Sequence, residues 1–365
     1  MARRVLALLA GIGLLILGAA PAGAANLNSQ NAYVVANLQS DVAGRAANTD
    51  PDLVNGWGIT AGPTTPWWVA DNGTHKSTLY NGNTGAKVTA VIVNVAGANN
   101  EPADPTGVVF NGTNTDFLLD PTVATSGARF IFDGEDGAIS GWAGGSVSTV
   151  KFTSTNGAIY KGLAIGTSSG HRYLYANDFH NNHVDVIDSS WHEQNWAGAS
   201  VDPGLPAGYA PFGIQNIAGN IFVTYAKQDA DREDEIAGPG FGFVSEFGTD
   251  GSFMGRVASG GALNAPWGLA WAPNDWERFG GHLLVGNFGD GRINGFRPTA
   301  SGWEARGHLK DAAHHPIVID GLWGIGFGNN NGTNNGASGS DHSLYFAAGP
   351  DDESHGLFGS ISQAP

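Results

Sequence analysis

A short pattern of hydrophobic residues around a glycine recurs six times along the chain. In each copy a residue, most often a bulky one, precedes the glycine and an aliphatic run follows it. The glycines are at positions 58, 107, 162, 213, 268 and 324, about 50 residues apart. Each copy is followed by a turn and a second apolar run, such as Trp67-Trp68-Val69-Ala70, and then by a polar loop and a third run. The runs are short and none has the period of a helix, so they predict strands.

Six copies of a unit of about four strands predict an all-β fold, a six-bladed β-propeller. The inner strands of such a fold crowd together at the axis, which explains a glycine in each first strand. The strand-like segment 32–38 precedes the first copy, so we expect it to form the outer strand of the last blade and to close the ring. A β-sandwich is the alternative, but it does not explain six copies of one motif.

The first 24 residues have the features of a secretory signal peptide. Arg3 and Arg4 precede an apolar stretch over residues 5–20, and Ala22-Gly23-Ala24 supplies a small-residue cleavage site. We therefore expect residues 1–24 to be removed and residues 25–365 to form a single propeller domain. An uncleaved anchor is the alternative. The product should be a secreted or periplasmic monomer, with no membrane span after cleavage.

Composition narrows the classes of function. The chain has 17 Lys and Arg against 33 Asp and Glu, a formal net charge of −16, so it has little to neutralise phosphates and nucleic-acid binding is excluded. It has no Cys, which excludes a disulfide scaffold, a thiol nucleophile and a thiolate metal site. Its 56 Gly residues and low charged fraction, 14%, fit an all-β chain with many turns.

Several stretches carry a resemblance to known propellers. They are Thr49-Asp50-Pro51 through Trp57-Gly58-Ile59, Trp68 to Gly73, Glu135-Asp136-Gly137, Tyr175 to Phe179 and Tyr225 to Asp231. On these residues the chain resembles the NHL-type six-bladed propellers and, more narrowly, an uncharacterised family of exported bacterial propeller proteins. The resemblance implies a propeller and export, but no activity, so function has to be argued from the sites.

The residue before each inner glycine is expected to face the axial opening. This ring consists of Trp57, Thr106, Lys161, Phe212, Trp267 and Trp323. Its four aromatic residues and one lysine predict a ligand-binding cup for a saccharide or another flat ligand, contacted by Trp57, Lys161, Phe212, Trp267 and Trp323. The alternative is that the aromatic residues pack on one another and plug the channel. Lys161 favours the cup, because burying a lysine costs free energy unless a carboxylate pairs with it.

The ring also bears on metal binding at the axis. Calcium-dependent lactonase-like propellers resemble this architecture but place Asn, Asp or Glu at these positions, and calcium needs six to eight oxygen ligands. The ring itself cannot supply them. Asn55, Asp104 and Asp320 lie two or three residues further back and are the residues through which a divalent ion could be held at the axis.

Acidic loops follow the second strand of several blades and open on the same face as the ring. Residues of these loops and Lys161 of the axial ring are weak candidates for catalysis, as general acid, base or cation: Lys161, Asp133, Glu135, Asp136 and His180. His180 belongs to the series Asp178-x-His180-x-x-His183-x-Asp185, whose residue types suit a metal although the turn does not favour convergence. Ordinary turn formation is the alternative for these carboxylates and histidines.

The fourth blade contains a long acidic insertion over residues 226–240. Its carboxylates are weak candidates for a calcium site or a polar lid over the channel mouth: Asp229, Asp231, Glu233, Asp234 and Glu235. The spacing does not match an EF-hand, and a solvated loop is the alternative. No cofactor is firmly indicated; calcium is the one considered.

Together these patterns predict an exported propeller that binds a small-molecule or saccharide ligand, or a protein partner, on its loop-rich face. The alternative is an enzyme, a carbohydrate-active lyase or glycoside hydrolase that uses the loop carboxylates and Lys161. Whether the chain is an enzyme is left open by the sequence.

Overall fold

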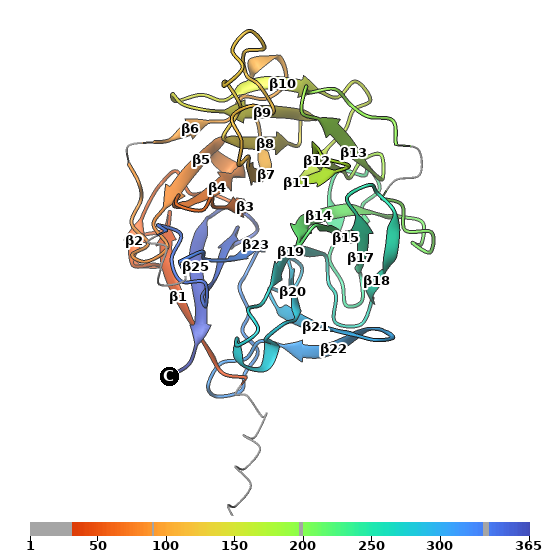
Figure 1. The fold of residues 1–365 in the computed structure, drawn as a ribbon. Helices are drawn as coiled ribbons and strands as arrows, with labels where there is room; N and C mark the ends of the chain where they lie inside the picture. Colours follow the sequence, from red (N-terminus) through yellow and green to blue (C-terminus); the bar gives the residue numbers. More distant parts are fainter. Residues whose placement is uncertain (1–30, 90, 197–199, 331–335) are drawn as a thin grey trace, which may run out of the picture.

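Six small antiparallel sheets surround one axis, and the first strand of each sheet lies nearest the centre (Figure 1). The computed structural model describes residues 31–365 with the exception of 90, 197–199 and 331–335. Every strand in the described part belongs to one of these six sheets. The six-bladed β-propeller predicted from the glycine repeat is therefore confirmed. The expected signal peptide lies outside the described residues.

The innermost two strands of each blade come from the first two apolar runs of each repeat. The inner strands are β3 (Gly56–Thr60), β7 (Pro105–Phe110), β11 (Tyr160–Ser168), β14 (Tyr209–Ile217), β19 (Pro266–Trp271) and β23 (Leu322–Phe327). The second strands are β4 (Trp67–Asp71), β8 (Phe130–Gly134), β12 (His171–Asp178), β15 (Asn220–Gln228), β20 (Leu283–Asn287) and β24 (Leu344–Ala348).

The outer strands are less regular. The third strands are β5 (Lys76–Tyr80), β9 (Ala138–Trp142), β13 (His183–Asp188), β17 (Phe243–Gly248), β21 (Ile293–Thr299) and β25 (Leu357–Gln363). The fourth are β6 (Val93–Asn94), β10 (Thr149–Thr153), β18 (Phe253–Ser259), β22 (Gly302–His308) and β1 (Tyr33–Ser40), and blade three has none in the described part. Two short strands, β2 (Asn48–Thr49) and β16 (Glu235–Ile236), pair with β1 and β15. Three short 3-10 helices are η1 (Asn72–Thr74), η2 (Ala98–Asn100) and η3 (Glu277–Phe279).

The N-terminal strand closes the ring as the sequence predicts. β1 pairs with β25 in antiparallel register from Tyr33 opposite Gln363 to Ser40 opposite Leu357. Tyr33 is buried and packs against Trp276, with 4.5 Å between the ring centres. The last blade is thus built from both ends of the described chain.

The inner glycines are required by close contact between neighbouring blades. A β-carbon placed on Gly58 would lie 2.6 Å from the carbonyl oxygen of Thr106 in the next blade. Around the far side of the ring, a β-carbon on Gly324 would lie 2.6 Å from the carbonyl oxygen of Trp57. The six first strands therefore pack backbone against backbone at the axis, which confirms the reason given for the repeat.

Hydrophobic packing joins each blade to its neighbours. Six clusters of buried residues each combine side chains from two adjacent blades, and a seventh lies on the axis. Between blades one and two, for example, Trp68 stacks on Phe130 with 3.8 Å between ring centres. No helix among the described residues is long and apolar enough to cross a membrane.

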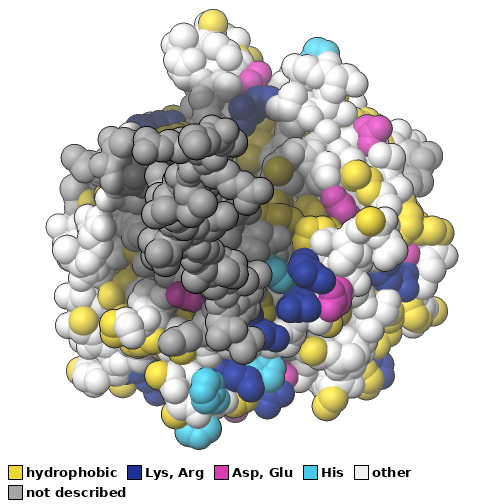
Figure 2. Space-filling view, turned by 60° about the horizontal axis from the view of Figure 1, so that its bottom comes forward, with side chains coloured by type: hydrophobic (Ala, Val, Ile, Leu, Met, Phe, Trp, Pro, Cys, Tyr) yellow, Lys and Arg dark blue, Asp and Glu magenta, His cyan; other side chains and the backbone are white. Residues whose placement is uncertain are grey.

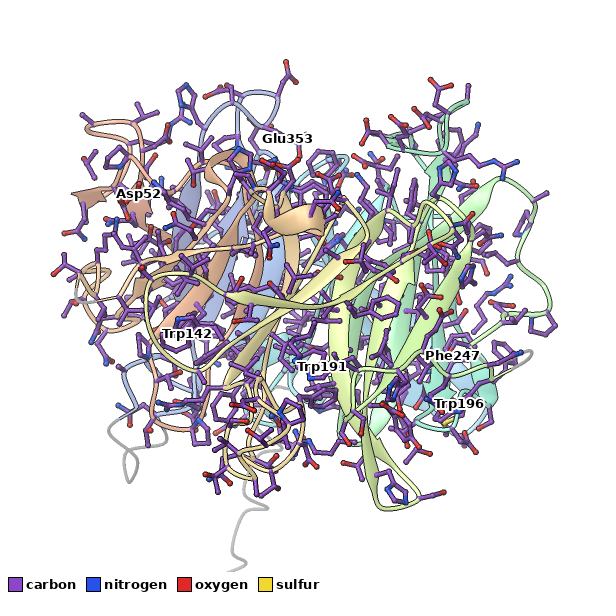
Figure 3. The ribbon with its side chains drawn as sticks, turned by 90° about the horizontal axis from the view of Figure 1, so that it is seen from above. Asp52, Trp142, Trp191, Trp196, Phe247 and Glu353 are labelled. Atoms are coloured by element: carbon purple, nitrogen blue, oxygen red, sulfur yellow. The ribbon has the colours of Figure 1, made fainter. Side chains whose placement is uncertain are left out.

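In the side view, Asp52 and Glu353 lie at one end of the blades, whereas Trp196 lies toward the opposite end (Figure 3). The loops at the Glu353 end include those between the second and third strands, for example Glu353 itself between β24 and β25. We call this end the mouth.

Candidate functional site

The six residues that precede the inner glycines all lie buried at the axis. The most exposed of them is Trp267, at 8%, and the other five are 3% exposed or less. The aromatic members join Phe179, Phe288 and three alanines in one hydrophobic cluster. The predicted register of these residues around the axis therefore agrees with the structure.

These aromatic residues pack face to face and edge to face rather than around an open space. Trp57 and Trp323 stack with 3.7 Å between ring centres, and Trp267 meets both edge on. Phe288 also stacks on Trp323, at 4.1 Å. With these rings packed against one another and buried, the axis holds a plug, not the open cup expected from the sequence. Ligand contact by Trp57, Lys161, Phe212, Trp267 and Trp323 stays a prediction.

Two indole N–H groups of the plug tie it to the surrounding blades, whereas that of Trp57 is buried without a hydrogen-bond partner among the described residues. Trp267 Nε1 donates to the carbonyl oxygen of Lys161 at 2.7 Å, and Trp323 Nε1 donates to Asn55 Oδ1 at 3.1 Å. Below the plug the inner strands enclose a small axial cavity of about 30 Å³. This volume suffices for a water molecule but not for a larger ligand.

Lys161, in β11, lies at the upper surface of the plug and faces carboxylates from two other blades. Its Nζ forms an ion pair with Glu135 Oε1, from the β8–β9 turn, and lies 3.1 Å from Asp234 Oδ1, from the insertion in blade four. It also lies 5.3 Å from the ring centre of Trp57. Burial alone would lower the pKa of Lys161, but the two carboxylates outweigh it and raise the pKa above the ordinary 10.5. Lys161 therefore stays charged although it is 1% exposed.

A polar network extends from this ion pair across the mouth. Asn72 Nδ2 donates to Glu135 Oε2 at 2.9 Å, which fixes the carboxylate that faces Lys161. Asn55 Nδ2 donates to Asn72 Oδ1 at 3.3 Å and to Glu353 Oε1 at 3.2 Å. Side chains from blades one, two, three, four and six are thus linked at a single mouth.

The carboxylates of the mouth differ in acidity. Burial raises the pKa of Glu235 to about 8; the charge of Lys161 opposes this rise, whereas Glu353 and Asp234 add to it. Burial also raises the pKa of Glu353. Near pH 7 the mouth therefore contains a largely protonated carboxyl group, Glu235, close to a charged ion pair. A proton donor and ionised carboxylates in one site are the components of acid–base chemistry.

The acidic insertion reaches the mouth through Asp234, and its role as a lid stays a prediction. After β15 the chain turns back through β16, and Lys227 and Gln228 pair with Ile236 and Glu235. Of the five carboxylates considered for calcium, Asp234 contacts Lys161, and Asp229 Oδ1 accepts the backbone N–H of Glu233 at 3.0 Å. These two side chains have different partners, and the calcium site stays a prediction. The three residues considered for a divalent ion at the axis have other partners in the structure. Asn55 accepts the indole N–H of Trp323, Asp104 pairs with His75 at 2.7 Å, and Asp320 Oδ2 accepts the backbone N–H of Asp351.

The other catalytic candidates form no side-chain hydrogen bond to this network among the described residues. Asp133 is buried beside the inner strand of its own blade, where Oδ1 accepts hydrogen bonds from Gly107 N and Thr106 Oγ1. Asp136 accepts the backbone N–H of Ala138 in its own turn and that of Ala98 in another loop. These contacts agree with the alternative that Asp136 stabilises a turn. His180 makes no polar side-chain contact with the mouth in the described part of the chain; its Nδ1 is buried without a partner.

One group of side chains among the described residues has a geometry suited to a metal ion. Asp178, His183 and Asp185 each place one ligand atom within 4.8 Å of the others. His183 Nε2 lies 2.7 Å from Asp185 Oδ1, and Tyr160 donates to the other oxygen of Asp185 at 2.6 Å. Asn181 donates to both oxygens of Asp178. These carboxylate oxygens already have partners within the protein. An ion pair between protonated His183 and the two carboxylates therefore explains the cluster without a metal ion.

The sequence places Asn72 and Glu353 in the acidic loops that follow the second strand of their blades, but it does not choose them as site residues. Glu135, which it does choose, lies in the corresponding loop of another blade. That shared position in the repeat was the available signal.

Six blades, axial glycine contacts and a polar mouth above a plug define the chain as a six-bladed β-propeller. Its family follows from two relatives in Acanthamoeba polyphaga mimivirus. Uncharacterized protein L690 is 31% identical over 87% of this chain and 82% of its own length, and Uncharacterized protein R648 is 32% identical over 79% and 72%. The chain belongs to the family of these proteins.

Solved structures support the fold alone. A protein of unknown function from Bacteroides thetaiotaomicron aligns over 91% of this chain and 76% of its own, with a TM-score of 0.56 and 11% identity. A glucose dehydrogenase aligns over 91% and 100%, with a TM-score of 0.50 and 13% identity. No family model matches the chain, so the NHL-type relationship is not confirmed, and the relationship to an exported bacterial family stays a prediction.

Proposed function

We propose that this protein is an exported ligand-binding propeller whose ligand is a small carboxylate, such as a uronate sugar, held by Lys161. The observation that carries the proposal is that the buried ammonium group of Lys161 is paired with Asp234, a carboxylate delivered by an insertion. Export rests on the signal features of residues 1–24.

The two carboxylates at Lys161 differ in how easily they can be replaced. The side chain of Asp234 is 73% exposed, whereas that of Glu135 is 27% exposed and is also held by Asn72. Asp234 can return to water at little cost, because it is already largely solvated. A ligand carboxylate that replaces Asp234 leaves the charge around Lys161 unchanged. We therefore infer that the insertion occupies the ligand position in the absence of ligand.

Groups around Lys161 suit the hydroxyl groups of a sugar acid. Asn55, Asn72 and Glu353 supply amide and carboxyl groups from two further blades. Amides both donate and accept hydrogen bonds, and carboxylates accept them, which matches a ring of hydroxyl groups. A saccharide with one carboxylate would use both the charge of Lys161 and this polar rim.

A second candidate function is catalysis on the same ligand, by a lyase or a glycoside hydrolase. It is favoured by Glu235, whose pKa of about 8 makes it a proton donor near pH 7, and by the Glu135 carboxylate that pairs with Lys161 in the same mouth. A Glu235→Gln variant that keeps ligand affinity but no longer turns over an oligouronate would support it. Absence of any product from oligouronates in the wild-type protein would reject it.

Calorimetric titration of the mature protein with galacturonate and glucuronate tests the binding proposal. We expect these acids to bind and neutral galactose and glucose to bind at least tenfold more weakly, since one desolvated charge pair contributes about 1.4 kcal/mol or more. Asp234→Asn should strengthen uronate binding, because the amide competes less well for Lys161. Asp231→Asn, an exposed acid of the same insertion, is the matched control and should leave affinity unchanged.

Lys161→Met should abolish uronate binding, and its folded state is checked by thermal unfolding. If that variant does not fold, the Asp234→Asn comparison still decides. Equal binding of uronates and neutral sugars, or equal effects of Asp234→Asn and Asp231→Asn, would show that Lys161 is not the anion site.

A further inference from the structure

A cleft lies between blades four and five, away from the mouth. It encloses about 390 Å³, within the range of ligand sites. Its walls come from the β14–β15 turn, the β21–β22 turn, the end of β19 and strand β17, and they include Ile217, Asn220, Phe222, Glu246, Trp271 and Trp303. Phe247, the neighbour of Glu246, lies toward the end of the blades opposite Glu353 (Figure 3).

Two indole rings form adjacent walls of this cleft. Trp271 is 37% exposed, in contrast to the buried tryptophans of the plug. Its ring centre lies 6.4 Å from that of Trp303, and the two planes are at 78°. Phe222 packs edge to face against Trp303 from the core, at 6.0 Å. The ring of Trp303 is thus fixed from within, while Trp271 offers an open aromatic surface.

The two indole rings lie beside polar groups whose hydrogen-bonding capacity is not fully used. Asn220 Nδ2 donates to Glu246 Oε1 at 2.7 Å, which orients the carboxylate. Within the described part of the chain, Glu246 Oε2 accepts no hydrogen bond, and neither the Trp271 nor the Trp303 indole N–H donates one. A sugar ring has an apolar face for an indole and hydroxyl groups at its edge for a carboxylate. The cleft offers both kinds of partner side by side.

The cleft continues toward the axis. A second hollow of about 310 Å³ at the lower end of the channel shares Ile217 and Trp271 with it. This hollow is also lined by Gln215, whose amide has no hydrogen-bond partner in the described residues. Because Trp271 lies between the two hollows, a ligand stacked on it can extend into both.

We propose that the groove centred on Trp271, between blades four and five, binds a neutral saccharide of two or more pyranose rings. One ring stacks on Trp271 and donates a hydroxyl to Glu246, and the next extends toward Gln215. Unlike the function proposed for Lys161, this site uses aromatic stacking and needs no charge on the ligand. The two proposals are independent.

The test uses cellotetraose, chitotetraose and mannotetraose as probes, each at up to about 10 mM, with binding followed by tryptophan fluorescence and calorimetry. We expect at least one of them to bind the wild-type protein. Trp271→Ala should weaken that binding about tenfold, and Glu246→Gln should weaken it severalfold, with thermal unfolding little changed. Phe253→Ala removes an aromatic residue of similar exposure, 41%, outside the groove and should not alter binding.

Two results would overturn the proposal. One is that none of the three tetrasaccharides binds. The other is that binding persists unchanged in a folded Trp271→Ala, Glu246→Gln double variant. If binding is kept in that double variant but lost in Lys161→Met, the saccharide binds at the mouth and not in the groove.

Discussion

Gly213 lies so close to Trp267 of the next blade that a β-carbon on Gly213 would come within 2.0 Å of the Trp267 carbonyl oxygen. This oxygen belongs to the backbone of an inner strand, so it cannot move aside without shifting the blade. The blade repeat and the axial plug thus depend on the same contact, since Trp267 is both the neighbour of the glycine and a member of the plug.

Gly213→Ala should therefore destabilise the protein by about 3 kcal/mol or more, because the added methyl forces two inner strands apart. Gly255, on an outer strand, has no heavy atom within 4 Å of the position of an added β-carbon. Gly255→Ala is the matched control and should change stability by less than about 0.5 kcal/mol. Denaturant unfolding measures both; equal stability of the two variants would contradict tight axial packing.

Removing an axial tryptophan should cost stability as a core deletion does. Trp323 is fully buried and stacked on two rings, so Trp323→Ala should lower the free energy of unfolding by about 3–5 kcal/mol. Trp267→Ala should behave similarly. If these residues serve only as a plug, uronate affinity measured on the folded fraction will be unchanged in both variants. Weaker affinity in a folded variant would restore the predicted ligand-contacting role.

Asp133 should make the protein less stable as the pH rises from about 4 to 7. Burial raises its pKa to about 7 from an ordinary 3.8, against the opposing hydrogen bonds from Gly107 and Thr106. Between these values the folded state binds more protons than the unfolded state, so the unfolding free energy falls with pH. Asp133→Asn, which keeps an acceptor for both donors, should remove this slope and add up to about 4 kcal/mol at pH 8. An unchanged pH profile would show that Asp133 does not titrate this way.

His183 should contribute stability that is lost at alkaline pH. Its hydrogen bond with Asp185 is the main cause of a pKa raised to about 9 from 6.5, with burial opposing and Asp178 adding to the rise. The contribution is complete below pH 6.5 and disappears as the pH rises through 9. His183→Gln should flatten this part of the profile in denaturant unfolding between pH 6 and 10. A wild-type midpoint that is constant over that range would contradict the assignment.

The insertion should be held by Lys161 rather than by calcium. Arg232 is exposed beside Asp234, so trypsin cleavage there reports on release of the insertion. We expect Lys161→Met to accelerate this cleavage and Asp231→Asn to leave it unchanged. Calcium and chelator should give equal rates, because Asp229 and Asp234 each have a partner other than a metal ion in the structure. Protection by calcium would revive the metal site considered from the sequence.

The fold could be predicted because one physical constraint, the space for only a glycine at the axis, repeats in every blade. The register of Lys161 and Trp323 follows from that same constraint. Whether the ring forms a cup or a plug could not be predicted, because Phe288, which stacks on Trp323, comes from the turn after β20 and lies outside the glycine pattern.

The polar contacts were harder to foresee. The pairing of Asp234 with Lys161 joins residues 73 positions apart through an insertion that no other blade shares. The groove at Trp271 joins the ends of strands in two blades, where the sequence alternation that marks a strand face has already stopped. On the side of the ring shown in Figure 2, basic and acidic side chains lie near one another, so charge alone marks no single site there.

The pairing of β1 with β25 also orders events during synthesis. Among the described strands, β1 (Tyr33–Ser40) is the first in chain order, and its antiparallel partner β25 (Leu357–Gln363) is the last. Closing a loop of this length costs conformational entropy, and the strand contacts that offset this cost form only after β25 has been synthesised. Until then the sixth blade lacks its outer strand and Tyr33 cannot reach its buried position beside Trp276. The first strand of the propeller in chain order is therefore among the last to join a sheet.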